Sequence, residues 1–319
     1  MSASVRPQLS EFALDVAEGL SSVPQKKLSP RYLYDDIGSM LFDAITLLPE
    51  YGLARADERV LRRCASSIRL ITGPMRLIAE LGSGAGNKTL HLLRDLAHPG
   101  DRLTYRPIDV SASALLACEK QIGRIADVHS IHADWLEGLE NVARDRSADG
   151  PLLLLFLGSS IGNLERGDIA PFLERIRRHL RPDDFFLLGA DLVKDVAEML
   201  AAYDDPIGVT AAFNLNLLNR MNRELGANFN ARAFAHEARW IEKDRRIEMH
   251  LVSHRNQRVF ISCIESAFNF QEGETIWTES SHKFTEQELE RYAHASGFQP
   301  IRTWVDSHWR FAEALWRVP

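Results

Sequence analysis

Short apolar runs alternate with segments of helix length between residues 76 and 193, and this alternation restricts the possible folds more than any other feature of the chain. Each run is followed by a turn and a helical stretch, which is the order expected of strands joined by crossover helices. Because such connections give parallel strands with helices on both faces, the pattern predicts an α/β fold. The predicted strands are residues 76–81, 103–109, 128–134, 152–158 and 185–191.

The first 60 residues follow a helical period instead. Ser10 is suited to cap a first helix, because its side chain can accept from a backbone N–H of the first turn. A second helix is predicted to start at Gly38 and to stop at Pro49, and a third to cover residues 57–71.

After Lys194 the alternation stops, and strand-like segments joined by polar turns take over. Asp244-Arg245 and Arg255-Asn256 are suitable hairpin positions, so an antiparallel meander is predicted. Its strands are expected at residues 238–243, 246–253 and 258–265.

The last 35 or so residues return to the first pattern, with a capped helix from Thr285 to Gly297 followed by two strand-like segments, 300–306 and 310–318. The parallel domain is therefore predicted to be discontinuous. Its expected segments are residues 57–193 plus 284–319, and a second, α+β domain takes residues 1–56 plus 194–283.

Composition narrows the class of partner. The chain has 319 residues, 45% of them hydrophobic, and a net charge of 38 − 44 = −6, without the basic stripe that nucleic acids require. No apolar run approaches the roughly 20 residues of a membrane span, and no signal peptide is recognisable. The three cysteines lie far apart, which indicates neither a disulfide framework nor a metal site. We expect a cytoplasmic protein that acts on a small molecule; its oligomeric state is left open, and a monomer is compatible with the sequence.

A glycine-rich loop follows the first predicted strand, in the sequence Glu80-Leu-Gly-Ser-Gly-Ala-Gly86. Gly82, Gly84 and Gly86 allow the backbone to turn sharply and a ligand to approach its N–H groups. The spacing matches neither the phosphate-binding loop that ends in Gly-Lys-Thr nor the dinucleotide fingerprint. It matches the loop of S-adenosylmethionine (SAM) enzymes, although a purely structural turn is the alternative.

Acidic residues follow the next two predicted strands. Asp109 is placed to accept both ribose hydroxyls of a nucleoside, and Asp134 and Trp135 to bind and cover an adenine ring. An ordinary helix cap and a half-exposed core tryptophan are the respective alternatives. The combination of loop, acid and acid–aromatic pair favours a SAM site.

Two other motifs compete with this interpretation. Gly158-Ser-Ser-Ile-Gly162 has the spacing of a hydrolase nucleophile elbow, but residues 163–167 are predicted to be a loop rather than the helix an elbow needs. His250 and His254 have a metal-ligand spacing for a helix, whereas on the predicted strand they lie roughly 13 Å apart. Neither hydrolysis nor metal binding is therefore expected.

The chain resembles the L-histidine Nα-methyltransferases of ergothioneine biosynthesis, and the segments that carry the resemblance cover nearly its whole length. The long segment 191–229 is the most specific, because other methyltransferases have no counterpart to it. The other matching segments are residues 28–51, 80–89, 107–111, 156–164 and 278–284. The resemblance implies a class I methyltransferase fold, which is Rossmann-like with a mostly parallel seven-stranded sheet, beside a substrate-binding domain. It also implies methyl transfer from SAM to the α-amino nitrogen of histidine, up to trimethylhistidine (hercynine), without a metal.

Site residues follow from the same resemblance, position by position. Asn163 and Tyr203 would hold the substrate carboxylate, and Tyr51, Glu279 and Ser281 the imidazole. The residues implied to line the cofactor are Tyr34, Gly82, Gly84, Gly86, Lys88, Asp109, Asp134 and Trp135. Tyr34 and Asn163 are the candidate catalytic residues, since Tyr34 would lie near the sulfonium and the amine.

The chain departs from the family pattern beside the expected imidazole site. Gly52 and Leu53 follow Tyr51 where many members have Tyr-Pro, and Ser280-Ser281-His282 replaces a more apolar sequence. Two alternatives therefore stay open. One is a SAM-dependent N-methyltransferase for another amino acid or small amine, and the other is a binding protein that keeps the fold without catalysis.

Overall fold

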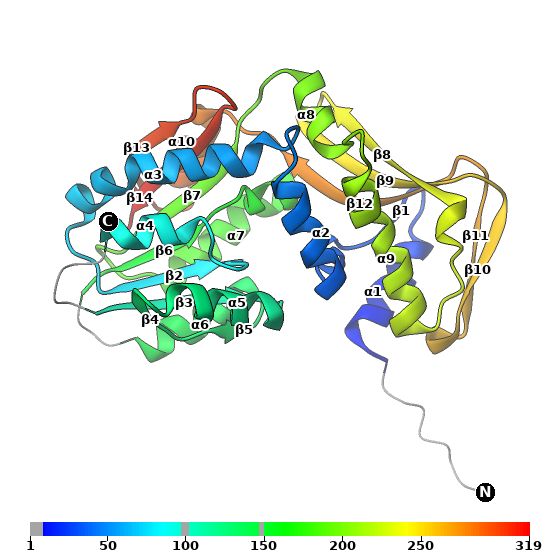
Figure 1. Ribbon diagram of the computed structural model, residues 1–319, viewed down its shortest axis with the longest axis horizontal. Coiled ribbons are helices and arrows are strands. Elements are labelled where there is room, and N and C mark those ends of the chain that lie inside the picture. The colour runs from blue at the N-terminus through cyan, green and yellow to red at the C-terminus, as the bar shows by residue number, and fades with distance from the viewer. Residues whose placement is uncertain (1–8, 97–101, 147–149) are drawn as a thin grey trace, which may run out of the picture. The chain divides into compact units, whose positions relative to one another are not determined.

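The computed structural model describes residues 9–96, 102–146 and 150–319, which form two compact units (Figure 1). Unit 1 contains the chain up to Glu50 together with Met199–Ile241 and Ile247–Ser280. Unit 2 contains Tyr51–Glu198, Glu242–Arg246 and Ser281–Pro319. Each unit is thus assembled from separated stretches of sequence.

Unit 2 is built on one mixed sheet in the order β13-β14-β7-β6-β2-β3-β4, with the short β5 also paired to β3. The strands from β2 to β7 are parallel, and β14 runs antiparallel to β7 and β13. Their bounds are β2 Leu77–Leu81, β3 Leu103–Asp109, β4 Ala126–Val128, β5 Ile131–His132, β6 Leu152–Phe156, β7 Phe185–Asp191, β13 Gln299–Val305 and β14 Phe311–Arg317. This arrangement confirms the predicted Rossmann-like, class I methyltransferase fold.

The single strand predicted at residues 128–134 is wrong, because the chain forms β4 and β5 with a break at His129 and Ser130. Both pieces keep one register against β3, since Val128 lies opposite Tyr105 and Ile131 opposite Ile108. Pro107 lies on β3 across from the break. A proline offers no N–H to the ladder, which accounts for the interruption.

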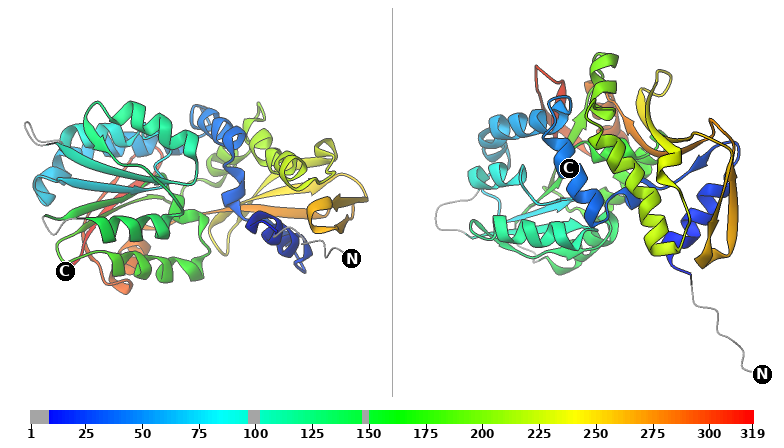
Figure 2. Two further views of the ribbon diagram at one scale, coloured as in Figure 1. Left: turned by 90° about the horizontal axis from the view of Figure 1, so that it is seen from below. Right: turned by 45° about the vertical axis from the view of Figure 1, so that its right-hand side comes forward.

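Helices cover both faces of this sheet (Figures 1 and 2). The helices α3 (Gly52–Thr72), α4 (Thr89–Leu96) and α5 (Ala112–Ile122) pack on one face, and α6 (Trp135–Asp145), α7 (Arg166–His179) and α10 (Glu286–Ala295) on the other. All five residues of β6 are fully buried, because alternate side chains enter the two cores. A continuous apolar run is what a strand covered on both faces requires.

Unit 1 combines helices with a small sheet in the order β1-β12-β9-β8 and a separate hairpin of β10 and β11. The helices are α1 (Glu11–Ser21), α2 (Asp36–Thr46), α9 (Val209–Leu225) and α8 (Val196–Tyr203), whose last residues lie in this unit. The strands are β1 Lys26–Lys27, β8 Phe234–Ile241, β9 Arg246–Ser253, β10 Gln257–Ile261, β11 Ser266–Phe270 and β12 Thr275–His282. Short 3-10 turns occur at Pro30–Leu33, Ser160–Asn163, Ala231–Ala233 and Ser262–Ile264.

The turn at Asp244-Arg245 joins β8 to its neighbour β9 as predicted, and Arg245 takes the left-handed conformation such turns favour. A hairpin between β9 and β10 at Arg255-Asn256 is wrong. β10 pairs with β11 instead, over five residues from Gln257 opposite Phe270 to Ile261 opposite Ser266. Alternation of apolar residues identifies a strand but not its partner.

Two predicted helix starts are confirmed, and two other helices begin earlier than predicted. The Ser10 cap on α1 is confirmed, and Thr285 caps α10 with Glu288 completing a capping box. The second helix begins at Asp36 rather than Gly38, because the Asp35 side chain accepts from the Gly38 N–H at 2.8 Å. The third begins five residues earlier than predicted, at Gly52.

The described residues contain no helix long and apolar enough to cross a membrane. Among them there is also no group of three or more His, Cys, Asp or Glu side chains that could hold a metal ion.

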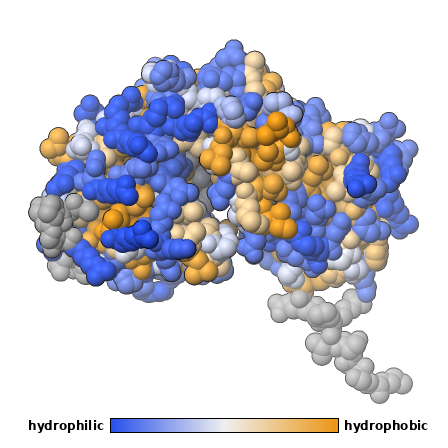
Figure 3. Space-filling view, viewed as in Figure 1, coloured by the Kyte–Doolittle hydropathy of each residue, from blue (hydrophilic) through white to orange (hydrophobic). Residues whose placement is uncertain are grey.

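Apolar side chains gather on the surface at α2 (Figure 3), where Met40 is 64% exposed and Leu47, which follows the helix, is 82% exposed.

Candidate active site

The glycine-rich loop continues directly from β2 in the middle of the unit 2 sheet. Gly82, Gly84 and Gly86 all have positive φ, at 68°, 53° and 73°, a conformation that other residues rarely adopt. A Cβ on Gly86 would lie 2.6 Å from Ile122 and 2.9 Å from Cys118. The loop therefore requires glycine both for its dihedral angles and for its packing against α5.

Asp109 ends β3 and faces this loop. Its Oδ2 accepts from the Gly84 N–H at 2.8 Å and its Oδ1 from the Ser111 N–H at 2.9 Å. Ser111, not Asp109, caps α5, so the alternative of an ordinary helix cap does not describe Asp109. The two backbone bonds fix the carboxylate as a hydrogen-bond acceptor, and its remaining lone pairs can receive donors from a ligand.

Asp134 and Trp135 begin α6, with Asp134 as the N-cap rather than as the end of a strand. Both cap hydrogen bonds, from Leu136 and Glu137, use Oδ1 of Asp134. The Trp135 ring is held edge-on to Phe156, with ring centroids 4.9 Å apart, and a Cβ on Gly82 would lie 3.1 Å from its Nε1. The half-buried indole is therefore both core packing and a neighbour of the loop.

Lys88 pairs with Asp57, a fully buried carboxylate on α3 that also accepts from the Gly158 N–H at 3.1 Å. Burial alone lowers the pKa of Lys88, but Asp57 outweighs it and raises the pKa above its usual value. Glu313 on β14 is also fully buried, and burial together with Asp57 raises its pKa far above normal. Burial thus favours the protonated form of Glu313, beside the ion pair of Lys88 and Asp57.

Glu80, the last residue but one of β2, connects the start of the glycine-rich loop to α4 and β3. Its Oε2 accepts from Thr89 at the start of α4, at 2.7 Å, and from the Tyr105 hydroxyl on β3. Burial raises the pKa of Glu80 to about 7, against the opposing effect of these hydrogen bonds. Glu80 therefore ties together the three elements that frame the loop.

The nucleophile-elbow motif lies at the end of β6 but has a different geometry from an elbow. Ser160, the serine of the motif, starts a 3-10 turn and donates to the Leu157 carbonyl at 3.2 Å. The strained position is Ser159, with φ of 63°, and its buried hydroxyl accepts from the Asp191 N–H. The expected loop at residues 163–167 is shorter than predicted, because α7 begins at Arg166.

Three of the implied substrate residues belong to unit 2. Tyr51 is buried at the N-terminus of α3, and Asn163 ends the 3-10 turn after β6. Ser281 is buried on β12, and its hydroxyl accepts from Lys283 Nζ at 2.9 Å. A Cβ on Gly162 would lie 2.9 Å from the His282 carbonyl oxygen, so the backbones beside Asn163 and Ser281 are in contact.

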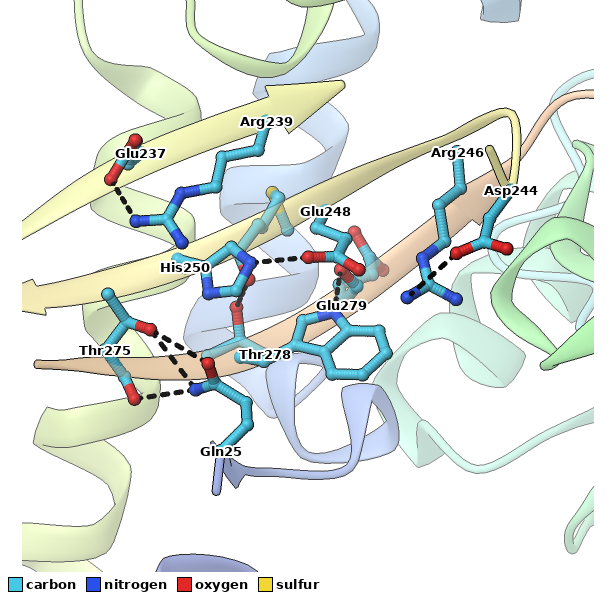
Figure 4. A network of polar contacts seen from close by, with 12 residues as sticks. Gln25, Glu237, Arg239, Asp244, Arg246, Glu248, His250, Thr275, Thr278 and Glu279 are labelled. Carbon is cyan, nitrogen blue, oxygen red and sulfur yellow. Dashed lines mark hydrogen bonds and ion pairs between the residues drawn. The ribbon is translucent and has the colours of Figure 1, made fainter. Parts of the chain in front are cut away.

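The other implied substrate residues belong to unit 1. The Tyr34 ring lies edge-on to Phe42 and to Phe213, with both centroid distances 5.5 Å. Tyr203 is buried at the end of α8, where its carbonyl accepts from His236 Nε2 at 2.7 Å. Glu279 is buried on β12, beside β9 with Glu248 (Figure 4).

The two histidines with metal-ligand spacing differ in environment, since His250 is buried and His254 is exposed. His250 is buried on β9, where its Nε2 bonds to Glu248 at 2.8 Å (Figure 4). The His250 ring stacks on Trp277. Burial lowers the pKa of His250. His254 follows the end of β9, so the strand interpretation of this segment is confirmed.

Sequence reasoning missed several buried polar residues next to the candidate site. Three of them share one signal, a charged residue within an otherwise apolar strand or helix stripe: Asp57 in α3, Glu80 in β2 and Glu313 in β14. That signal shows that a charge is buried but not which partner neutralises it. The missed residues are Asp57, Glu80, Asp191, Lys283 and Glu313.

The loop and the two acids fit a nucleoside with a polar tail. Glycines with positive φ let the backbone approach a ligand, Asp109 is fixed as an acceptor, and Trp135 offers an aromatic surface. These are the features needed to hold the ribose, adenine and amino-acid parts of SAM.

The chain is similar to known SAM-dependent methyltransferases. Residues 12–318 match the family described as histidine-specific, SAM-dependent methyltransferases. The chain is 42% identical to the histidine N-alpha-methyltransferase of Mycobacterium tuberculosis over 94% of its own length and 93% of that protein. It is 29% identical to ergothioneine biosynthesis protein 1 of Neurospora crassa, over 88% of this chain and 32% of that longer protein.

Among solved structures, a SAM-dependent methyltransferase from Clostridium acetobutylicum superimposes with a TM-score of 0.50. The match covers 89% of this chain and 99% of that one, at 13% sequence identity. At this identity the similarity concerns the fold alone.

Proposed function

The chain belongs to the family of histidine-specific, SAM-dependent methyltransferases, and we propose that it methylates the α-amino nitrogen of L-histidine up to trimethylhistidine, hercynine. It is a SAM-dependent N-methyltransferase. The proposed step belongs to ergothioneine biosynthesis, in line with the name of the fungal relative. The structural observation that carries the proposal is the bond from the Gly84 N–H to Asp109, which joins the glycine loop to the acid after β3.

Unit 2 is proposed to hold SAM. Asp109 would accept from the ribose hydroxyls and Asp134 from the adenine amino group, while Trp135 covers the ring. Gly82, Gly84 and Gly86 would border the methionyl part, and Lys88 would approach its carboxylate while keeping Asp57 as partner. When bound, SAM supplies an electrophilic methyl group.

Histidine recognition is proposed to depend on the five residues that the family resemblance implies. Glu279 and Ser281 are two residues apart on β12 and so share one face of the strand, where a carboxylate and a hydroxyl suit the two ring nitrogens of imidazole. Tyr51 would add a further contact to the ring. Asn163 and Tyr203 would hold the substrate carboxylate without adding a positive charge beside the cationic methyl donor.

Catalysis then consists mainly of alignment. Methyl transfer to an amine needs the nitrogen lone pair in line with the methyl–sulfur bond and the exclusion of water, and it needs no covalent nucleophile on the protein. The α-ammonium group must first lose a proton. We propose that Tyr34 relays this proton, its hydroxyl oxygen accepting it while the hydroxyl's own proton passes to water, or that a water molecule beside Tyr34 and Asn163 receives it.

Mass spectrometry after incubation with SAM and each amino acid separately tests the substrate. A histidine product carrying three added methyl groups is the expected result. The proposal would be contradicted if the protein binds SAM in calorimetry but produces no methylated histidine.

The same screen decides the second candidate, methylation of another amino acid or amine. The observation that favours it is the departure from the family pattern at Gly52, Leu53 and residues 280–282, all beside the proposed imidazole residues. A methylated product from another amino acid alone would establish it. Absence of SAM binding would instead indicate a non-catalytic member of the fold.

A further inference from the structure

Asp191, the last residue of β7, organises a buried charge cluster that the proposed mechanism does not use. Only 1% of Asp191 is exposed. Its Oδ2 binds Lys283 Nζ at 2.9 Å, while its Oδ1 accepts from Trp309 Nε1 at 3.1 Å and from Lys194 Nζ at 2.5 Å. A buried carboxylate with three donors is strongly constrained in position.

Lys283 extends this constraint to Ser281. The Lys283 side chain is fully buried, and its ammonium donates to Ser281 Oγ at 2.9 Å as well as to Asp191. An ammonium group has only donors, so the Ser281 oxygen is the acceptor in this contact. The hydroxyl proton of Ser281 is then directed to an acceptor elsewhere, and donation from a cation strengthens it as a donor.

We propose that Lys283 is a positioning residue for histidine recognition, which makes the Ser281 hydroxyl a hydrogen-bond donor toward the unprotonated nitrogen of a neutral imidazole ring. Glu279, on the same face of β12, then accepts from the ring N–H. The inference rests on the proposed function and adds to it the polarity of the ring contacts. A ring without the acceptor nitrogen would leave the Ser281 proton unmatched, so this arrangement selects for imidazole.

The same carboxylate supports the other unit 2 residue assigned to the ring. Trp309, oriented by Asp191, lies against the backbone of Gly52, where a Cβ would come within 2.1 Å of the indole. Gly52 directly follows Tyr51. Asp191 thus anchors Ser281 through Lys283, and Tyr51 through Trp309.

Lys194 provides a matched control, since it is a second ammonium on the same carboxylate. It donates to Asp191 and to the Leu192 carbonyl. Burial, with a further contribution from Lys283, lowers the pKa of Lys194 to about 8. Replacing it removes a buried lysine from the cluster without removing the donor to Ser281.

A double-mutant cycle tests the proposal through KM for histidine, kcat and SAM affinity. K283M is expected to raise KM for histidine by about tenfold or more, since a charge-assisted contact is lost, with kcat changed by less than about twofold. SAM binding in calorimetry should be unchanged. In an S281A background, K283M should add nothing to KM, because the contact it supports is already absent.

Two results would overturn the proposal. One is an equal rise in KM from K283M with and without Ser281, and the other is a rise of the same size from K194M. Either would show a general structural effect of the cluster. If K283M does not fold, as judged by circular dichroism, K283Q is subject to the same comparison with S281A, since it removes the ammonium charge and keeps a polar side chain in the cluster. If the wild-type protein methylates histidine but K283M and S281A show no coupling in KM, this inference alone is contradicted. If the wild-type protein does not methylate histidine, the proposed function is contradicted.

Discussion

Single buried residues set the electrostatics under the glycine loop, and Glu80 is the clearest example. Its carboxyl is held by Thr89 and Tyr105 in a site where only 2% of the residue is exposed. The raised pKa, about 7 against an ordinary value of 4.5, means that the fold prefers the protonated form. Ionisation of Glu80 therefore opposes folding.

Glu80 makes the folded protein less stable as the pH rises. Between pH 4.5 and 7 the unfolded chain releases the Glu80 proton and the folded chain retains it, so stability from this group falls as pH rises. E80Q keeps an acceptor oxygen and cannot ionise. We expect its unfolding free energy to improve relative to wild type by roughly 2 kcal/mol between pH 5 and pH 7. Denaturant titrations of both proteins at the two pH values measure this, and a difference independent of pH would contradict it.

Replacing Asp109 is expected to weaken the binding of SAM. D109N replaces an acceptor-only group with one that has two donors, so it cannot receive the Gly84 and Ser111 N–H groups and ribose hydroxyls together. We expect SAM affinity in calorimetry to fall about tenfold or more. Asp127 on β4, which pairs with Arg102 at the surface, is the control, and D127N should bind SAM like wild type. Equal losses in the two variants would remove Asp109 from the cofactor site.

At the scale of elements, helix packing depends on glycine where the backbone meets a side chain. Gly52 begins α3 against the Trp309 ring, and Gly167 lies in the first turn of α7 with nothing within 4 Å of a Cβ. The departure from the family pattern at position 52 therefore has a physical reason in this chain, because a larger residue would overlap the indole.

Replacement by alanine is expected to change the stability in opposite directions at these two glycines. G52A should destabilise the protein by about 2 to 3 kcal/mol through overpacking, while G167A should be neutral or stabilise it by up to about 1 kcal/mol through helix propensity. Thermal or denaturant unfolding of both variants measures this. Similar stability changes in the two variants would show that the Trp309 contact relaxes without strain.

At the scale of the whole molecule, the two units should respond differently to ligands. The residues proposed to bind SAM, apart from Tyr34, belong to unit 2, whereas the β10–β11 hairpin belongs to unit 1. Hydrogen exchange measured by mass spectrometry should therefore slow at residues 82–86 and 135–137 when SAM is added, since binding suppresses local opening. Exchange in β10 and β11 should stay unchanged. Equal protection of the hairpin would contradict the assignment of SAM to residues 82–86 and 135–137.

The parallel sheet of unit 2 could be predicted from the order and composition of the chain. The continuous apolar runs in β6 and β7 could be buried only between two layers of helices, and the caps at Ser10 and Thr285 depend on residues within one turn. These features are local or periodic, and a pattern of nearby residues is enough to specify them. The loop glycines and Asp109 were identifiable for the same reason, because their positions relative to strand ends follow from the chain order.

Pairings between distant residues could not be predicted and became visible in the folded chain. Asp57 and Lys88, Asp191 and Lys283, and Gly52 and Trp309 are each separated by more than 30 positions in the sequence. The partner of β10 and the break between β4 and β5 opposite Pro107 belong to the same class. A side chain's sequence neighbours do not say which distant group will neutralise its charge or occupy the space beside it, since burial and electrostatic pairing depend on three-dimensional proximity.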